Sequence, residues 1–135
     1  MKILGIEHIG IAVDDLNDTS SFWGNILDIL HTHTEVVESE QVKTTIFDTG
    51  KGKVELLSPS SSNSVIEKFI KNKGTGVHHV CLEVDCINQA INRLKENNIV
   101  LINDKPKIGA EGYKIVFIHP KSTGGVLVEL AEKPK

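Results

Sequence analysis

Two histidines and two glutamates stand at matching places in the two halves of this sequence. The segment that begins at His8 can be laid on the segment that begins at His79 without a gap, so that histidine, apolar alternation and aspartate coincide. Glu55 and Glu129 each stand between a valine and a leucine. Imidazole nitrogens and carboxylate oxygens together suit a divalent metal that keeps positions open for water or substrate. We therefore predict one metal site with these four ligands.

Each of the four residues has a simpler explanation when it is taken alone. A single buried histidine is more often a hydrogen-bonded core residue than a ligand, and a lone glutamate can face outward from an edge strand. A purely structural role, however, does not predict the same two residue types at the same two places in both halves. The repeat therefore favours the metal site. Three other histidines are not expected to be ligands: a structural role, or a supporting role beside the metal ligands, is expected for His78, and solvent exposure for His31 and His33.

Strand parity places the paired histidines on one face of their strands. Successive residues of a strand point to opposite faces, so the apolar residues after His8 and His79 face a helix and the histidines face away from it. An unpaired carboxylate in the otherwise apolar strands around Glu55 and Glu129 would be costly, so each needs a partner or a cation.

Hydrophobic periodicity predicts the same βαβββ order in both halves, which makes the fold class α+β. Asp14 or Asp15 is a suitable cap for the first helix, which should end near Asp28, and a polar serine-rich stretch precedes a linker helix. The chain is expected to form a single domain, 1–135, with module one at 1–60, the linker helix at 61–75 and module two at 76–135. Strands are predicted at 4–13, 31–38, 41–48, 53–58, 77–84, 99–102, 113–118 and 125–131.

Composition narrows the kind of partner. The chain has 135 residues, 39% of them hydrophobic, and a formal net charge of -3. It has no basic stripe for nucleic acid and no apolar run long enough for a membrane span, so we expect neither partner. The first residues lead into a strand pattern instead of a secretory signal, which predicts a cytoplasmic protein. The spacing of Cys81 and Cys86 favours two reduced structural thiols.

Around these residues the sequence resembles the vicinal-oxygen-chelate superfamily, which includes glyoxalases and bleomycin-resistance proteins. The resemblance covers nearly the whole chain and implies two pseudo-symmetric βαβββ modules that form a cupped eight-stranded sheet around a metal. His8, Glu55, His79 and Glu129 fall on the four ligand positions of that pattern. Glyoxalase I and methylmalonyl-CoA epimerases share these positions, so the ligands alone do not choose the substrate.

The segments between the ligands resemble the epimerase family. They are HIGIAV (8–13), ELLSP (55–59), GVHHV (76–80), KIGA (107–110) and HPKSTGGVLVEL (119–130). Glyoxalase I more typically has Asp-Pro-Asp-Gly where this chain has His119, Pro120 and Lys121. We expect His119 and Lys121 to contact substrate, although Lys121 could equally be an ordinary surface lysine.

The resemblance implies epimerisation of (2R)- and (2S)-methylmalonyl-CoA by α-proton abstraction through a metal-stabilised enolate. It implies one divalent ion (Co, Mn, Ni or Zn), an acyl-CoA thioester as the partner, and Glu129 and Glu55 as opposing bases. We also expect a homodimer. The alternatives are a lactoylglutathione lyase of the glyoxalase I type and a non-catalytic small-molecule binding protein. The chain departs from part of the epimerase family at the second base. Some epimerases have glutamine in place of Glu55 and carry an acidic residue at about the position of Thr44.

Overall fold

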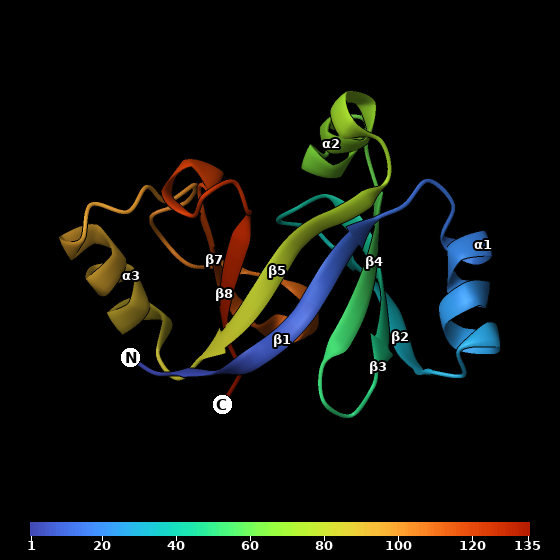
Figure 1. Ribbon diagram of the computed structural model, residues 1–135, viewed down its shortest axis with the longest axis horizontal. Helices are drawn as coiled ribbons and strands as arrows, with labels where there is room; N and C mark the ends of the chain where they lie inside the picture. Colours follow the sequence, from blue (N-terminus) through green and yellow to red (C-terminus); the bar gives the residue numbers. More distant parts are fainter. The chain divides into compact units, whose positions relative to one another are not determined.

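A computed structural model describes residues 1–135, in which strands and helices alternate as βαβββ twice (Figure 1). A linker helix stands between the two copies. The strands are β1 Ile3–Ala12, β2 Leu30–Val37, β3 Val42–Asp48, β4 Lys53–Pro59, β5 Gly76–Val84, β6 Lys107–Ile108, β7 Lys114–Ile118 and β8 Val128–Glu132. The helices are α1 Leu16–Ser20, α2 Val65–Lys73 and α3 Ile87–Glu96, with a π-helix at Ser21–Ile26 and 3-10 turns at Ala110–Gly112 and Pro120–Ser122.

The strands form a mixed eight-stranded sheet in the order β2-β3-β4-β1-β5-β8-β7-β6. β1 pairs in parallel with β4, as β5 does with β8, and the strands between them pair antiparallel. This topology confirms the predicted α+β class and the βαβββ repeat. Contacts divide the chain into two compact units, which we call the first unit (His8–His78) and the second unit (Met1–Glu7 with His79–Lys135).

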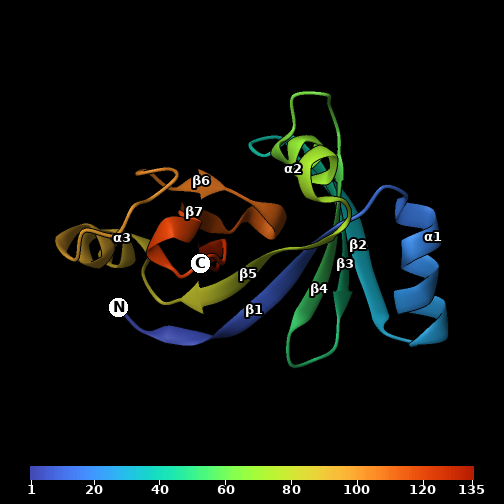
Figure 2. The ribbon, with the colours of Figure 1, turned by 45° about the horizontal axis from the view of Figure 1, so that its top comes forward.

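In the first unit, the helical segment after β1 covers one face of the sheet. Figures 1 and 2 show α1 alongside β2, β3 and β4. The core beneath it holds Val13, Phe47 and Leu56, with Ile11, Leu16, Trp23, Ile29 and Val54 packed around them. The prediction that the apolar side of the first strand meets the helix is therefore confirmed.

Side-chain caps fix the starts of two helices in this unit. The Asp15 carboxylate accepts hydrogen bonds from the backbone N–H groups of Asn17 (2.8 Å) and Asp18 (3.2 Å), as a cap for α1 should. The Ser64 hydroxyl accepts from the N–H of Ile66 (3.1 Å) at the start of α2. Both caps lie where the sequence predicts them.

The helix after β1 changes character in a way that the sequence does not predict. It begins as α1 and continues as a π-helix over Ser21–Ile26, a rare conformation in proteins. Gly24 lies against the ring of Phe47: a Cβ atom there would be 3.0 Å from Cε1 of that ring. The absent side chain thus allows a close approach of the π-helix to the sheet.

In the second unit, α3 packs over β5, β7 and β8. Its buried residues Ile87, Ala90 and Ile91 form a core with Val84, Val116, Ile118 and Leu130. The Glu132 carboxylate of β8 accepts from the N–H of Ile87 (2.8 Å) and so caps α3 from outside the helix. The backbone N–H of Lys2 donates to Asp85 (2.7 Å), and this bond holds the pKa of the Asp85 carboxyl below its ordinary value.

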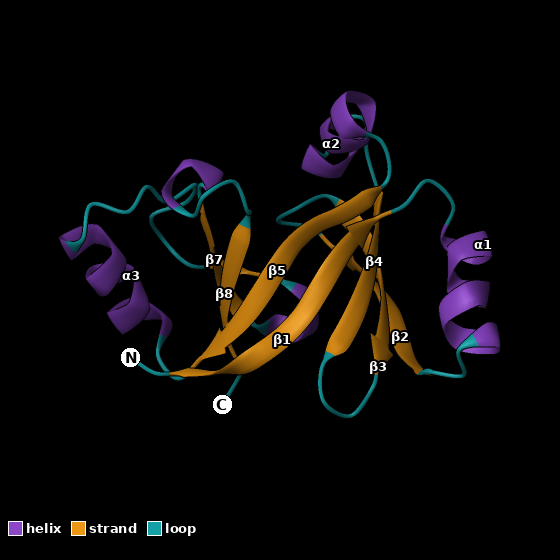
Figure 3. Ribbon diagram, viewed as in Figure 1, coloured by secondary structure: helices purple, strands orange, loops and turns teal.

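The predicted strand at 99–102 is wrong. Leu101 forms only an isolated bridge with Ile118, and the strand that pairs with β7 is β6, further along the chain at Lys107–Ile108. Figure 3 draws the segment after α3 as loop. The apolar pattern there reflects burial, since Ile99 and Leu101 pack against the core under α3. The other predicted strands lie within a few residues of the observed ones. None of the helices is long and apolar enough to cross a lipid bilayer.

Candidate metal and active site

The first unit holds one of the two His–Glu pairs. In the parallel pairing of β1 with β4, Glu55 lies opposite Gly10, two residues after His8 and therefore on the same face as His8. Val54 and Leu56 point the other way, into the core under α1. Nδ1 of His8 lies 3.0 Å from a carboxylate oxygen of Glu55. Only 6% of His8 and 3% of Glu55 are exposed.

The second unit repeats this geometry. In the parallel pairing of β5 with β8, Glu129 lies opposite Cys81, again two residues after the histidine, His79. Nε2 of His79 lies 3.3 Å from a carboxylate oxygen of Glu129, and 5% of each residue is exposed. The ring of Phe117 meets the His79 ring edge to face at a centroid distance of 5.6 Å, which fixes the plane of the imidazole. The two pairs therefore match in residue type, register and burial.

Burial gives each pair a strong requirement for positive charge. A carboxylate removed from water is stable only with hydrogen-bond donors or a cation beside it. Neutral imidazole offers one donor nitrogen and one acceptor nitrogen, and the acceptor is also the usual metal-ligating atom. Each pair thus presents one nitrogen and one oxygen atom that can coordinate a metal, in a buried environment that favours a cation.

Comparison with known proteins identifies the family. Residues 7–117 match the model of the glyoxalase/bleomycin resistance protein/dioxygenase superfamily. The methylmalonyl-CoA epimerase of Mus musculus is 41% identical over 97% of this chain and 74% of its own length. The chain belongs to the methylmalonyl-CoA epimerase family of this superfamily. The predicted resemblance to this superfamily, and within it to the epimerases, is confirmed.

Two further relatives of the family cover nearly all of this chain. The ethylmalonyl-CoA/methylmalonyl-CoA epimerase of Cereibacter sphaeroides is 40% identical over 94% of this chain and 96% of its own. A variant of the Streptomyces coelicolor methylmalonyl-CoA epimerase, solved in complex with 2-nitronate-propionyl-CoA, superposes with a TM-score of 0.93. That structure is 28% identical and covers 99% of this chain and 100% of its own. The likeness thus extends over the whole epimerase fold.

His119 and Lys121, which the sequence predicts to contact substrate, lie in the turn between β7 and β8. Nδ1 of His119 accepts a hydrogen bond from the N–H of Lys121 (3.1 Å), so this histidine caps the short 3-10 turn. The N–H of His119 donates to the carbonyl of Val100 (2.8 Å), which ties the turn to the segment after α3. The side chain of Lys121 is exposed. Their contact with substrate stays a prediction.

The remaining histidines lie in different settings. His78 packs edge to face against Phe69 of α2 at a centroid distance of 4.9 Å, which fits the structural role expected for it. His31 lies on the helix-covered face of the sheet, where its ring is 5.4 Å from that of Phe47. His33 is on the opposite face, and the difference arises from a β-bulge between these two residues.

A second His–Glu pair of the first unit lies on the same sheet face as His8 and Glu55. His33 is opposite Ile46 on β3, and Ile46 is opposite Glu55 on β4. Nε2 of His33 lies 3.0 Å from a carboxylate oxygen of Glu35, and the side chains are 40% and 30% exposed. The sequence predicts solvent exposure for His33 and a solvated strand and turn for the charge-rich run that begins at Glu35, because nothing in a run of polar residues reveals the bulge that orients these two side chains.

Proposed function

We propose that this protein interconverts the (2R) and (2S) epimers of methylmalonyl-CoA, with a divalent metal ion held by His8, Glu55, His79 and Glu129. The observation that carries the proposal is the recurrence of one buried His–Glu pair at the equivalent register in both units. The names of the relatives supply the substrate, an acyl-CoA thioester. A homodimer in the cytoplasm is part of the same proposal.

The donor set fits a divalent ion. Two imidazole nitrogens and two carboxylate oxygens match the mixed ligands of Co, Mn, Ni and Zn sites, and all four side chains are buried. An ion bound there would supply positive charge next to the thioester carbonyl and make the neighbouring C–H more acidic. The identity of the ion is left to metal analysis.

The protein's own part in the reaction is to move a proton at the carbon between thioester and carboxylate. Inversion needs one base on each side of the planar intermediate. We assign these roles to Glu55 and Glu129, whose equivalence in the repeat makes them opposing candidates. One carboxylate oxygen accepts the α-proton, and the other glutamate returns a proton to the opposite face. Positioned bases of this kind contribute roughly 10²- to 10⁴-fold to a rate.

If Glu55 is not the second base, the sequence alone offers Glu38 and Glu40 as the first acids to test, whereas the strand register offers Glu35. Thr44 is 1% exposed and has no group that ionises near neutral pH, so it cannot replace an acidic residue at this position. Glu38 and Glu40, the two acidic residues that most closely precede Thr44, lie in the turn between β2 and β3. Glu35 lies directly opposite Thr44 on β2 and on the same face as Glu55. Glu35 is therefore the next candidate.

Turnover of methylmalonyl-CoA tests the proposal directly. We expect epimerisation to be much faster than conversion of the glutathione hemithioacetal of methylglyoxal, to disappear with a chelator and to return with a divalent ion. Full activity in metal-free protein would refute the metal role. The opposite substrate ranking would move the assignment to a glyoxalase I type lyase, and no turnover of either would favour a binding protein.

Isotope exchange separates the two bases. In heavy water, a two-base enzyme delivers deuterium mainly to product, because the base that accepts the proton is not the base that returns one. Glu55→Gln should block inversion and still let Glu129 exchange the α-proton of one epimer, and Glu129→Gln should exchange only the other epimer. Inversion by Glu55→Gln at a near wild-type rate would shift the second base to Glu35.

A further inference from the structure

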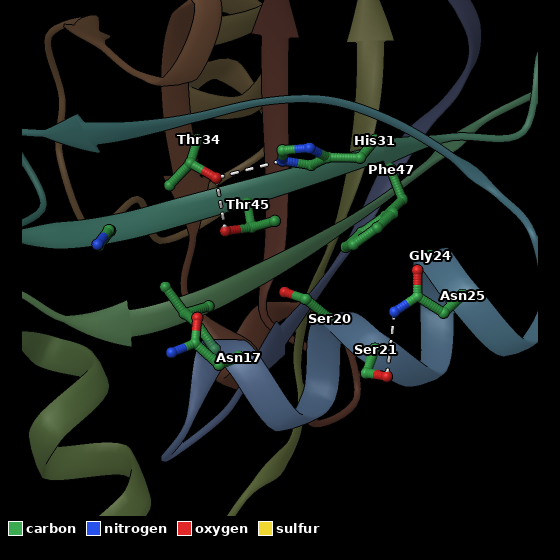
Figure 4. A pocket seen from close by; sticks show the side chains of 11 residues that line it. Asn17, Ser20, Ser21, Gly24, Asn25, His31, Thr34, Thr45 and Phe47 are labelled. Atoms are coloured by element: carbon green, nitrogen blue, oxygen red, sulfur yellow. Dashed lines mark hydrogen bonds between the residues drawn. The ribbon is translucent and has the colours of Figure 1, made fainter.

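The first unit contains a cleft on the sheet face that lies away from His8 and Glu55. It has a volume of about 380 Å³ and lies between α1 with its π-helix and the strands β2 and β3 (Figure 4). Phe47 lines it and belongs to the core under α1, which places the cleft on the helix-covered face. A volume of this size falls within the range of small-molecule sites. The proposed metal site does not account for this cleft.

The lining of the cleft is rich in hydrogen-bond donors and contains no carboxylate. Lys43 supplies a positive charge, and two asparagine amides, one imidazole and several hydroxyls supply further donors. The chain as a whole has more acidic than basic residues, 18 against 15, and yet none of the acidic side chains lines this space. Such a lining is suited to an anion with several acceptor oxygens.

Two backbone irregularities border the cleft. Ser21, Gly24 and Asn25 line it from the π-helix, a rare conformation that is frequent at functional sites. The β-bulge in β2 places His31 opposite Phe47, on the cleft side, whereas regular alternation would put it on the same face as His33. Both irregularities direct polar groups into the same space.

The polar side chains on the strand side are already ordered by hydrogen bonds. Nε2 of His31 lies 3.3 Å from the Thr34 hydroxyl, which lies 3.0 Å from the Thr45 hydroxyl. Figure 4 shows this chain of three side chains above the Phe47 ring, with Ser20 and Asn17 on the facing helix. Thr45 is 3% exposed, so the chain is anchored in the protein interior. A ligand would meet donors that are held in place before it binds.

We propose that this cleft binds a phosphate group, either as inorganic phosphate or as the terminal phosphate of an ester. Lys43 provides the charge, and the asparagine amides and the His31–Thr34–Thr45 chain provide donors to the phosphate oxygens. The site lies on the face opposite the first unit's metal ligands, so phosphate can bind there without occupying them. This proposal does not depend on the proposed epimerase activity.

Amide chemical shifts of the ¹⁵N-labelled full-length protein, titrated with inorganic phosphate at constant ionic strength, test the proposal. We expect saturable shifts at Gly24, His31, Thr34 and Thr45, and a dissociation constant at least tenfold higher in Lys43→Gln. Lys68→Gln is the matched control, because Lys68 is an exposed lysine of the same unit outside the cleft and should bind as the wild type does.

Titrations with coenzyme A and with 3′-dephospho-coenzyme A distinguish the sources of the phosphate. Saturable shifts at the cleft with the first compound and not with the second identify the 3′-phosphate of coenzyme A as a ligand. Shifts with inorganic phosphate alone identify a free phosphate site. Absence of saturable shifts with all three compounds, or equal affinity in Lys43→Gln and Lys68→Gln, would overturn the proposal.

Discussion

A single ion shared by both His–Glu pairs should stabilise the fold by an amount that can be calculated. A ligand that binds only the folded state adds about 2.7 kcal/mol when its free concentration is one hundred times its dissociation constant. Unfolding entropy is about 2.1 cal/mol/K per residue, hence about 0.28 kcal/mol/K for 135 residues. When the metal-free protein is given the ion at this concentration, its melting temperature should therefore rise by about 10 °C.

The shift should depend on both pairs at once. If loss of one ligand weakens binding about a thousandfold, the same ion concentration stabilises the variant by less than about 0.1 kcal/mol. His8→Ala and His79→Ala should then each lose essentially the whole shift, measured against their own metal-free melting temperature by calorimetry. His31→Ala and His33→Ala are the matched controls and should keep it. Metal analysis should find one ion per chain. Two ions per chain, or half of the shift in His8→Ala, would mean that each pair binds its own ion.

Three further predictions concern stability. Leu56→Ala should lower the free energy of unfolding, measured in urea, by about 2 to 5 kcal/mol, because Leu56 is fully buried. The same change at the exposed Leu30 is the control and should cost less than about 0.5 kcal/mol. Equal losses in the two variants would contradict the described core. Ser64→Ala should cost about 1 kcal/mol through loss of the α2 cap, and Ser64→Asn should recover most of it. Asp85→Asn should lower the melting temperature more at pH 7 than at pH 2.5, since a carboxyl with a lowered pKa in the folded state contributes stability above its unfolded pKa and loses it as pH falls. An equal difference at both pH values would exclude this linkage.

Much of the fold can be predicted from this sequence because the same pattern of strands and polar residues occurs in both halves. Alternation in β1 and β5 gives the face of each histidine, and the apolar neighbours of Glu55 and Glu129 give the face of each carboxylate. Local chemistry predicts helix caps at Asp14 or Asp15 and within the serine-rich stretch before α2, and the structure selects Asp15 and Ser64. These features depend on short segments, whose periodicity the sequence displays directly.

Features that depend on backbone irregularity could not be predicted in the same way. The stretch from His31 to Glu35 is polar on both faces, so its pattern carries no mark of the bulge that separates His31 from His33. The π-helix uses the same residue types as an α-helix. The segment 99–102 is apolar because it covers the core under α3, and apolar character alone does not distinguish such a covering segment from a paired strand.

The division of β1 has a consequence for any attempt to split or rearrange the gene. Glu7 and His8 are consecutive residues of one strand, but they are grouped with different units. A cut between His78 and His79 would leave the N-terminal fragment with a strand end that has lost its neighbours and the C-terminal fragment with an uncovered edge on β5. Co-expressed halves should consequently be active only when they reassociate, and a circular permutant opened at the Gly50 turn, which keeps β1 intact, is the better starting point for engineering.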